Sequence, residues 1–181
     1  MRAGNALLDA RAIFSALDIP RGAVVVDVGA GRTGHFALHA AEAVGDKGKV
    51  FAVDIIRDAL SMIASSAALR GLHHVQTLWG DVERGQGVGL ADGSADYALL
   101  VHTLHTLRAH DVAAQEVRRV MKPGGRIVVI DWLPLTSHVI APPQGHRIAP
   151  EDADTAFTRA GCVRCGHFSP SPAHWGRIYS S

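Results

Sequence analysis

The residues most capable of chemistry form a glycine turn flanked by two acids. The turn is Gly29-Ala30-Gly31, Asp27 stands just before it, and Asp54 follows further along the chain. Because glycine has no Cβ and tolerates positive φ, a ligand can lie against the main chain of such a turn. A carboxylate at Asp54 can accept both hydroxyls of a ribose. These residues predict a site for a nucleoside-containing cofactor.

The elements that must position these residues follow in the order strand, turn, helix, strand, acid. Residues 23–28 are a β-branched run typical of a strand buried on both faces, and residues 35–44 have a helical period. Residues 49–53 predict a second strand that ends at Asp54. An ordinary βαβ crossover without a ligand is the alternative, but the order of all these features favours a cofactor site.

The acid before the turn bears on the type of nucleoside. A dinucleotide places its pyrophosphate at the helix N-terminus, where Asp27 would repel it, whereas an acid suits a ligand with a cationic amino group. The segment Asp27-Val28-Gly29-Ala30-Gly31 resembles the first motif of class I S-adenosylmethionine-dependent methyltransferases. The third glycine, Gly34, stands one residue later than in the commonest motif, and we expect it to allow the helix to pack closely on its strand.

This resemblance implies S-adenosyl-L-methionine as cofactor and S-adenosyl-L-homocysteine as product. In the family, an acid after the third strand accepts the adenine amino group and the next backbone N–H meets a ring nitrogen, which corresponds to Asp81 and Val82. An apolar residue after the ribose-binding acid, here Ile55, would lie against the adenine. The cofactor-binding residues expected on this basis are Asp27, Gly29, Ala30, Gly31, Asp54, Ile55, Gly80, Asp81, Val82 and Val101.

Histidines follow the fourth predicted strand, near the place where donor and acceptor should meet. An imidazole titrates near neutrality, so His102 is the first candidate for a catalytic base and His105 the second. A metal site including His110 is the alternative, but helical spacing alone is poor evidence for one, and we expect no metal.

Alternating apolar segments predict the remaining elements. They are helices at 5–17, 57–69, 109–121 and 150–160, strands at 75–79, 95–101, 126–130, 163–168 and 175–179, a turn at 122–125 and a loop at 133–149. The series resembles the class I methyltransferase sheet from end to end. It predicts an α/β, Rossmann-like seven-stranded sheet, mostly parallel with a C-terminal antiparallel strand, and helices on both faces.

The segment from Trp132 to Pro150 resembles a subgroup near the ubiquinone/menaquinone and arsenite methyltransferases. Residues 133–149 are a candidate lid, equally well a plain surface loop, and Trp132 and Arg147 are candidate substrate contacts. Cys162 and Cys165 have redox-motif spacing, but we expect them to be small apolar fillers on opposite faces of a strand.

Composition predicts a single domain over residues 1–181 and disfavours some classes of partner. The chain is 48% apolar and 19% charged with a net charge of +1, which argues against nucleic acid as partner. No segment predicts a signal peptide or a membrane span, so we expect a cytoplasmic monomer or homodimer with a small-molecule acceptor. An NAD-binding oxidoreductase and a non-catalytic cofactor-binding domain remain the alternatives.

Overall fold

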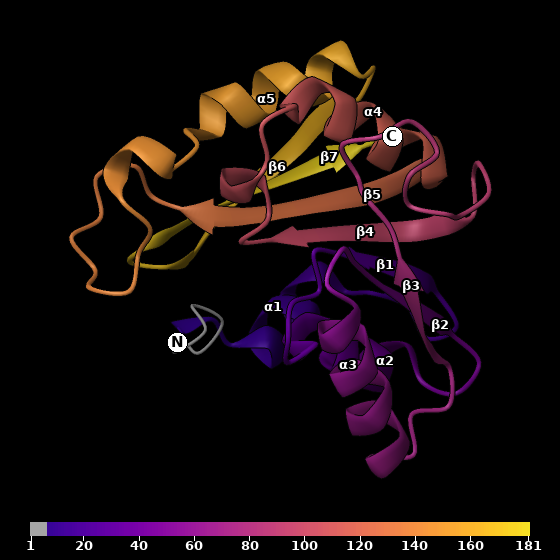
Figure 1. Cartoon of the computed structure of the whole chain (residues 1–181). Helices are drawn as coiled ribbons and strands as arrows, with labels where there is room; N and C mark the ends of the chain where they lie inside the picture. Colours follow the sequence, from indigo (N-terminus) through magenta and orange to yellow (C-terminus); the bar gives the residue numbers. More distant parts are fainter. Residues whose placement is uncertain (1–6) are drawn as a thin grey trace.

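The structure, a computed structural model, describes residues 7–181 and contains a twisted sheet with helices on both faces (Figure 1). The elements in chain order are α1 (Ala10–Leu17), β1 (Val24–Val28), α2 (His35–Val44), β2 (Lys49–Asp54), α3 (Arg57–Leu69), β3 (Val75–Trp79), β4 (Ala95–Val101), η2 (Leu104–Thr106), α4 (His110–Val120), β5 (Met121–Trp132), η3 (Gln144–His146), α5 (Pro150–Arg159), β6 (Val163–Ser171) and β7 (His174–Ser180). The predicted seven-stranded α/β sheet is confirmed.

The strand order places the predicted cofactor turn at a reversal of the sheet. The order is β3-β2-β1-β4-β5-β7-β6, with β1 to β5 paired in parallel. β7 runs antiparallel between β5 and β6. Chain connections leave β1 and β4 in opposite directions along the sheet. Open α/β sheets bind ligands in the crevice that such a reversal creates at the carboxyl ends of the strands.

Two hydrophobic cores sandwich the sheet, and β1 contributes to both. Val25 packs in the core with α1, α2 and α3, whereas Val26 packs in the core with α4 and α5. Successive side chains of a strand point to opposite faces, so an unbroken β-branched run suits a central parallel strand. The two helical layers lie above and below the sheet in Figure 1.

The first helix begins later than the sequence pattern predicts. It starts at Ala10, because the side chain of Asp9 accepts a hydrogen bond from the backbone N–H of Ala12 at 3.0 Å and caps the helix. Positions 5 and 6 of the predicted helix lie outside the described residues.

The turn predicted at 122–125 is part of β5 instead, and the preceding helix ends at Val120. Gly124 has φ +77°, in the left-handed region, and its N–H donates to the carbonyl of Ser181, so this segment runs alongside residue 181. The pairing of β5 with β4 changes register here, which indicates a bulge. β6 also extends past its predicted end through Pro170, which an edge strand tolerates because one side needs no ladder hydrogen bonds.

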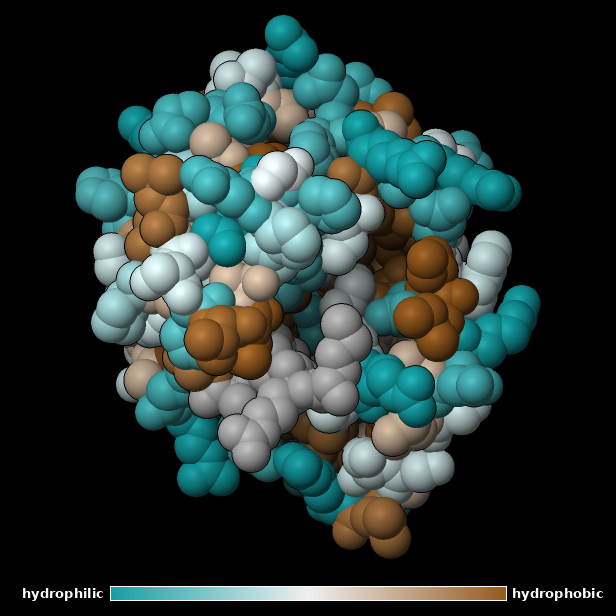
Figure 2. Space-filling view, turned by 60° about the vertical axis from the view of Figure 1, so that its left-hand side comes forward, coloured by the Kyte–Doolittle hydropathy of each residue, from teal (hydrophilic) through white to brown (hydrophobic). Residues whose placement is uncertain are grey.

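The carboxyl edge of the sheet collects the loops that carry the predicted site residues. Large apolar side chains are exposed there, among them Ile55 and Ile56 after β2 and Leu135 and Val139 after β5. Figure 2 brings this side of the molecule forward and shows apolar groups standing at the surface among polar ones. Within residues 7–181, no helix is both long and apolar enough to cross a bilayer.

Candidate active site

The turn after β1 is fastened to the acid after β2 by backbone amides. Gly29 and Gly31 have φ +74° and +67°, the left-handed region that favours glycine. The N–H of Gly31 donates to Oδ2 of Asp54 at 2.8 Å, and the N–H of Ile56 donates to Oδ1 at 2.9 Å. Asp54 therefore fixes the glycine turn against the start of α3 and keeps its carboxylate at the edge of the sheet.

Two of the glycines are required by close neighbours. A Cβ on Gly29 would lie 2.6 Å from Oγ1 of Thr103, which donates to the carbonyl of Val28 at 2.9 Å. A Cβ on Gly34 would lie 2.8 Å from Ile63 of α3. Gly34 was expected to let α2 pack closely on its own strand, and the contact that its missing Cβ permits here is with α3.

Asp27 lies beneath the turn and not on its open side. It is 2% exposed and accepts a backbone hydrogen bond from Ala37, in the first turn of α2. The N-cap residue of α2, Gly34, has no side chain that could cap the helix. Asp27, which lies on β1, accepts the Ala37 N–H in its place. Burial raises the pKa of Asp27 to about 7, the Ala37 amide lowers it, and the nearby Asp54 raises it further.

A first cavity of about 360 Å³ opens beside the turn, in the size range of small-ligand sites. Its lining residues are Val28, Gly29, Val53, Asp54, Ile55, Ile56, Gly80, Asp81, Val82, Glu83, His102, Thr103, Thr106 and Leu107. The structure thus brings together six of the predicted cofactor residues: Gly29, Asp54, Ile55, Gly80, Asp81 and Val82. Asp27, Ala30, Gly31 and Val101 are not part of this lining.

The positions of these four residues differ. The N–H of Ala30 donates to the carbonyl of Val53 at 3.1 Å, so Ala30 and Gly31 continue the turn at the cavity edge. Val101 is 7% exposed and packs in the core with α1 and α2. Its predicted contact with the cofactor therefore has no counterpart in the cavity lining, because the side chain of Val101 faces the core.

The loop after β3 forms one wall of the first cavity and is tied to the start of α4. Oδ1 of Asp81 accepts the N–H of Glu83 at 3.0 Å, and Oδ2 lies 3.0 Å from Nε of Arg84. Oε1 of Glu83 accepts the N–H groups of Arg108 and Ala109, each at 2.7 Å. Glu83 thereby joins the walls that follow β3 and β4.

The predicted base His102 sits in a buried aromatic cluster. Its ring stacks on Trp132, with centroids 4.9 Å apart, and lies 4.7 Å from the ring of His174. Burial lowers the pKa of His102 to about 3, with His174 lowering it and Asp131 raising it. Burial also lowers the pKa of His174 to about 4, although Asp131 raises it. Both rings are therefore neutral at physiological pH.

The other predicted base, His105, is held by a buried carboxylate. Its Nδ1 lies 2.8 Å from Oδ1 of Asp131, and its backbone N–H donates to Oδ2 of Asp131 at 3.1 Å. The side chain of Asp131 is 1% exposed and that of His105 is 14% exposed. His105 is thus oriented by its partner and still reaches open space.

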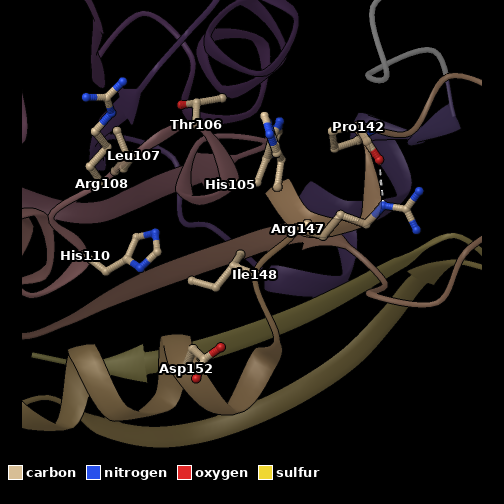
Figure 3. Close-up of a pocket in the computed structure, with 11 residues that line it drawn as sticks. His105, Thr106, Leu107, Arg108, His110, Pro142, Arg147, Ile148 and Asp152 are labelled. Atoms are coloured by element: carbon tan, nitrogen blue, oxygen red, sulfur yellow. Dashed lines mark hydrogen bonds between the residues drawn. The ribbon is translucent and has the colours of Figure 1, made fainter.

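A second cavity of about 600 Å³ adjoins the first (Figure 3). It is lined by His105, Thr106, Leu107, Arg108, His110, Pro142, Gly145, His146, Arg147, Ile148 and Asp152. Thr106 and Leu107 line both cavities and so form the partition between them. This arrangement offers two neighbouring compartments at one edge of the sheet.

The two predicted substrate contacts differ in their positions. Arg147 lines the second cavity, and its guanidinium donates to the carbonyls of Pro142, Pro134 and Thr136 at 2.7, 2.9 and 2.6 Å. It therefore braces the 133–149 loop, and Figure 3 shows the bond to Pro142. Trp132 is 3% exposed and lines neither cavity, because its ring is covered by His102 and His174.

The cysteines occupy opposite environments. Cys162 is buried and burial raises the pKa of its thiol, whereas Cys165 is exposed and its Sγ lies 3.5 Å from the carbonyl of Ile178. Both are free thiols. The part of the chain from residue 7 onward holds no group of three or more His, Cys, Asp or Glu side chains placed to ligate a metal ion.

Sequence reasoning missed several residues of this edge: Glu83, Thr103, Thr106, Leu107 and, as a partner of His105, Asp131. Glu83 directly follows the predicted site residue Val82, and Thr103 directly follows His102, after the ends of β3 and β4. That spacing was the available signal, since loops after parallel strands meet at one edge of the sheet.

Comparison with known proteins gives a consistent family signal. The sequence model of the family described as "Methyltransferase domain" matches residues 19–161. A demethylmenaquinone methyltransferase from Geobacillus stearothermophilus is 29% identical over 119 residues, covering 66% of this chain and 49% of that protein. One from Staphylococcus epidermidis is also 29% identical over 119 residues and is covered to 47%. The chain therefore spans about half the length of these relatives.

Solved structures share the fold. A SAM-dependent methyltransferase from Aquifex aeolicus has a TM-score of 0.89 at 22% identity, with 99% of this chain and 93% of that chain covered. An arsenic(III) S-adenosylmethionine methyltransferase from Chlamydomonas reinhardtii has a TM-score of 0.67 at 21% identity, with 88% of this chain and 63% of that chain covered. At these identities the likeness concerns the architecture, and it agrees with the Rossmann-like prediction.

Proposed function

Because this chain belongs to the methyltransferase-domain family, we propose that it transfers a methyl group from S-adenosylmethionine to a small-molecule acceptor. The observation that carries the proposal is the glycine turn after β1, which is bonded to Asp54 and opens on the first cavity at the reversal of the strand order. A turn, a ribose-binding acid and a cavity at this point suit a nucleoside.

The donors and acceptors of the first cavity fit S-adenosylmethionine. Each oxygen of Asp54 accepts one backbone N–H and keeps lone pairs that can accept the ribose hydroxyls. Ile55 is 61% exposed and offers an apolar surface for the adenine. Asp81 and the backbone N–H of Val82 are assigned to the adenine edge. Gly29 and Gly31, without Cβ atoms, leave the main chain accessible to the methionine part.

Asp27 is assigned an indirect part in binding the cofactor's ammonium. It lies under the turn, 2% exposed, and its Oδ2 has no hydrogen-bond partner among the described residues. A positive charge arriving on the turn above would favour the ionised form of this carboxylate, whose pKa burial has raised to about 7. Ionised Asp27 would in turn attract the ammonium through the thin glycine turn.

Methyl transfer places modest chemical demands on the protein. When bound, the sulfonium of S-adenosylmethionine supplies an activated methyl group with a good leaving group. The chain's own task is to align the acceptor in line with that bond and to exclude water. Thr106 and Leu107, which line both cavities, define where the two ligands would meet.

Of the two predicted bases, we assign the role to His105. Burial and the neighbouring His174 hold the pKa of His102 at about 3, too low for an efficient base at neutral pH. Its ring is stacked on Trp132 and therefore helps to shape the wall of the first cavity. His105 lines the second cavity and is oriented by Asp131.

The NAD alternative is disfavoured by the start of α2. A dinucleotide would place its pyrophosphate at the N-terminus of this helix, where free N–H groups attract an anion. Here the Ala37 amide in the first turn already binds the carboxylate of Asp27. A non-catalytic cofactor-binding domain would share the first cavity, and turnover separates it from an enzyme.

Parallel calorimetric titrations with S-adenosylhomocysteine and NAD test this proposal. We expect heat only from the former, and an Asp54→Ala variant should bind it about tenfold more weakly, because the ribose hydrogen bonds are lost. The exposed Asp58 in the first turn of α3 provides a matched Asp→Ala control with unchanged affinity. Binding of NAD without binding of S-adenosylhomocysteine would reverse the assignment.

A further inference from the structure

The second cavity contains a histidine–carboxylate pair whose geometry defines a proton acceptor. Asp131 is fully buried, and its Oδ1 accepts the N–H of Trp132 at 2.8 Å as well as facing Nδ1 of His105. An ionised carboxylate only accepts hydrogen bonds, so Nδ1 of His105 must carry its proton. In the neutral ring, Nε2 then holds the free lone pair.

The pair is fixed from several directions. Oδ2 of Asp131 binds the backbone N–H of His105, so the carboxylate holds both the ring and the main chain of the same residue. Asp131 belongs to β5 and His105 to η2, which the chain places next to each other at the sheet edge. Because the ring cannot swing away without breaking its hydrogen bond to Asp131, its lone pair keeps one orientation in the cavity.

Charged groups of both signs surround His105 in the second cavity. Figure 3 shows His105 in the middle of the lining, with Arg108 on one side and Arg147 on the other. The remaining titratable groups are His110 and His146 on the lining, Asp152 at the start of α5, and the ring of His102, whose centroid is 6.4 Å from that of His105. Two guanidinium groups thus face one lining carboxylate, and the carboxylate of Asp131 behind His105 adds a second negative charge.

We propose that the second cavity binds the methyl acceptor and that His105 removes a proton from its reacting atom. The acceptor class is then a small molecule with a weakly acidic hydroxyl, of the phenol or enol type. The proposal rests on the proposed function for the methyl donor. It adds the acceptor class and gives Asp131, a residue outside the sequence prediction, the role of positioning the base.

The step balances as follows. The acceptor O–H proton moves to Nε2 of His105, and the oxygen forms a bond to the methyl carbon. The bond between that carbon and the sulfonium sulfur breaks, and its electron pair stays on sulfur, which becomes a neutral thioether. His105 returns the proton to solvent through the open side of the cavity. Tertiary amines and thioethers do not belong to this acceptor class, because their reacting atom carries no proton for His105 to remove.

A series of phenols with graded acidity tests the acceptor class, with S-adenosylhomocysteine formation as the readout. His105→Gln should lower kcat by about 100-fold for weakly acidic phenols. The loss should shrink as the phenol pKa falls below the assay pH, since such acceptors arrive already ionised. Affinity for S-adenosylhomocysteine should stay unchanged, and the exposed His73 supplies a matched His→Gln control. An equal loss across the series, or no loss, would overturn the proposal.

The orientation of the pair can be tested without any acceptor. In ¹⁵N spectra, the neutral ring of His105 should be in the Nδ1–H form. Asp131→Asn should change the mixture of tautomers and shift the pH profile of methyl transfer. An Nε2–H ring in the unsubstituted protein would remove the base and refute the inference. Failure of the protein to bind S-adenosylhomocysteine would instead refute the proposed function, so the two failures are distinguishable.

Discussion

Replacing Asp27 by asparagine should stabilise the ligand-free protein while weakening the cofactor site. The substitution keeps an oxygen that can accept the Ala37 N–H and removes the charge from a side chain that is 2% exposed. Burial raises the pKa of Asp27 from 3.8 to about 7. Each unit of difference between folded and unfolded states corresponds to about 1.4 kcal/mol, so the full difference is about 4 kcal/mol.

The sign follows from the direction of the pKa change. Because the folded pKa lies above the unfolded one, protonated Asp27 favours folding below about pH 4, and this contribution is lost as the pH rises to about 7. Above that pH the folded protein holds a buried, ionised carboxylate with one oxygen lacking a hydrogen-bond partner among the described residues. Asp27→Asn removes this cost, and the gain in unfolding free energy should be about 2–4 kcal/mol at about pH 8.

Urea unfolding of both proteins without ligand at about pH 8 and about pH 5 measures this effect. The gain in unfolding free energy caused by Asp27→Asn should fall to about one third of its pH 8 value at the lower pH, because the folded wild-type side chain is protonated there. Calorimetry at about pH 8 should show S-adenosylhomocysteine binding about tenfold more weakly to the variant. Equal stability of the two proteins at the higher pH would refute the assignment of Asp27 as a buried carboxylate whose ionisation destabilises the fold.

Three further perturbations address the walls of the site. Gly29→Ala should abolish measurable binding of S-adenosylhomocysteine in calorimetry, because the new Cβ meets Oγ1 of Thr103 at 2.6 Å and φ is +74°. Glu83→Ala should speed hydrogen exchange of the amides at 104–110, because two of them lose their acceptor. Glu83→Gln should preserve most of their protection, since its oxygen can still accept both N–H groups. Unchanged exchange in the alanine variant would contradict the role of Glu83 in joining the loops after β3 and β4. Acid unfolding should begin as the pH drops below about 6.5, because burial lowers the pKa of His102 to about 3 and of His174 to about 4 and the unfolded chain binds protons more readily. Replacing His174 by phenylalanine should reduce the steepness of that loss in a pH series of thermal melts.

The fold was predicted by local patterns, in which the conformation of each residue depends mainly on its neighbours in sequence. The β-branched run of β1, the glycine turn and the acid ending β2 lie within one βαβ unit, so chain order alone brings Gly31 and Asp54 together. Turn chemistry misled at 122–125, where glycines normally end an element. The segment there belongs to β5, and the distant Ser181 supplies hydrogen-bond partners to Gly124 and Gly125.

The ranking of the site residues depended on contacts that no local pattern encodes. The sequence placed His102 ahead of His105 as a candidate base, and only the tertiary structure shows that His102 is stacked on Trp132 and His105 is bonded to Asp131. Arg147, the predicted substrate contact, lines the second cavity, and its guanidinium also donates to three carbonyls of its own loop.

The sequence by itself determined the class of sheet, the cofactor turn and the acids that flank it, because strand period, helix period and glycine conformation are properties of adjacent residues. Only the tertiary structure decided that Asp27 caps α2 from β1, that Thr103 leaves no room for a Cβ on Gly29, and that the two cavities share a wall. Those arrangements arise where loops after different strands meet, and burial and charge there depend on atoms contributed by the whole sheet edge.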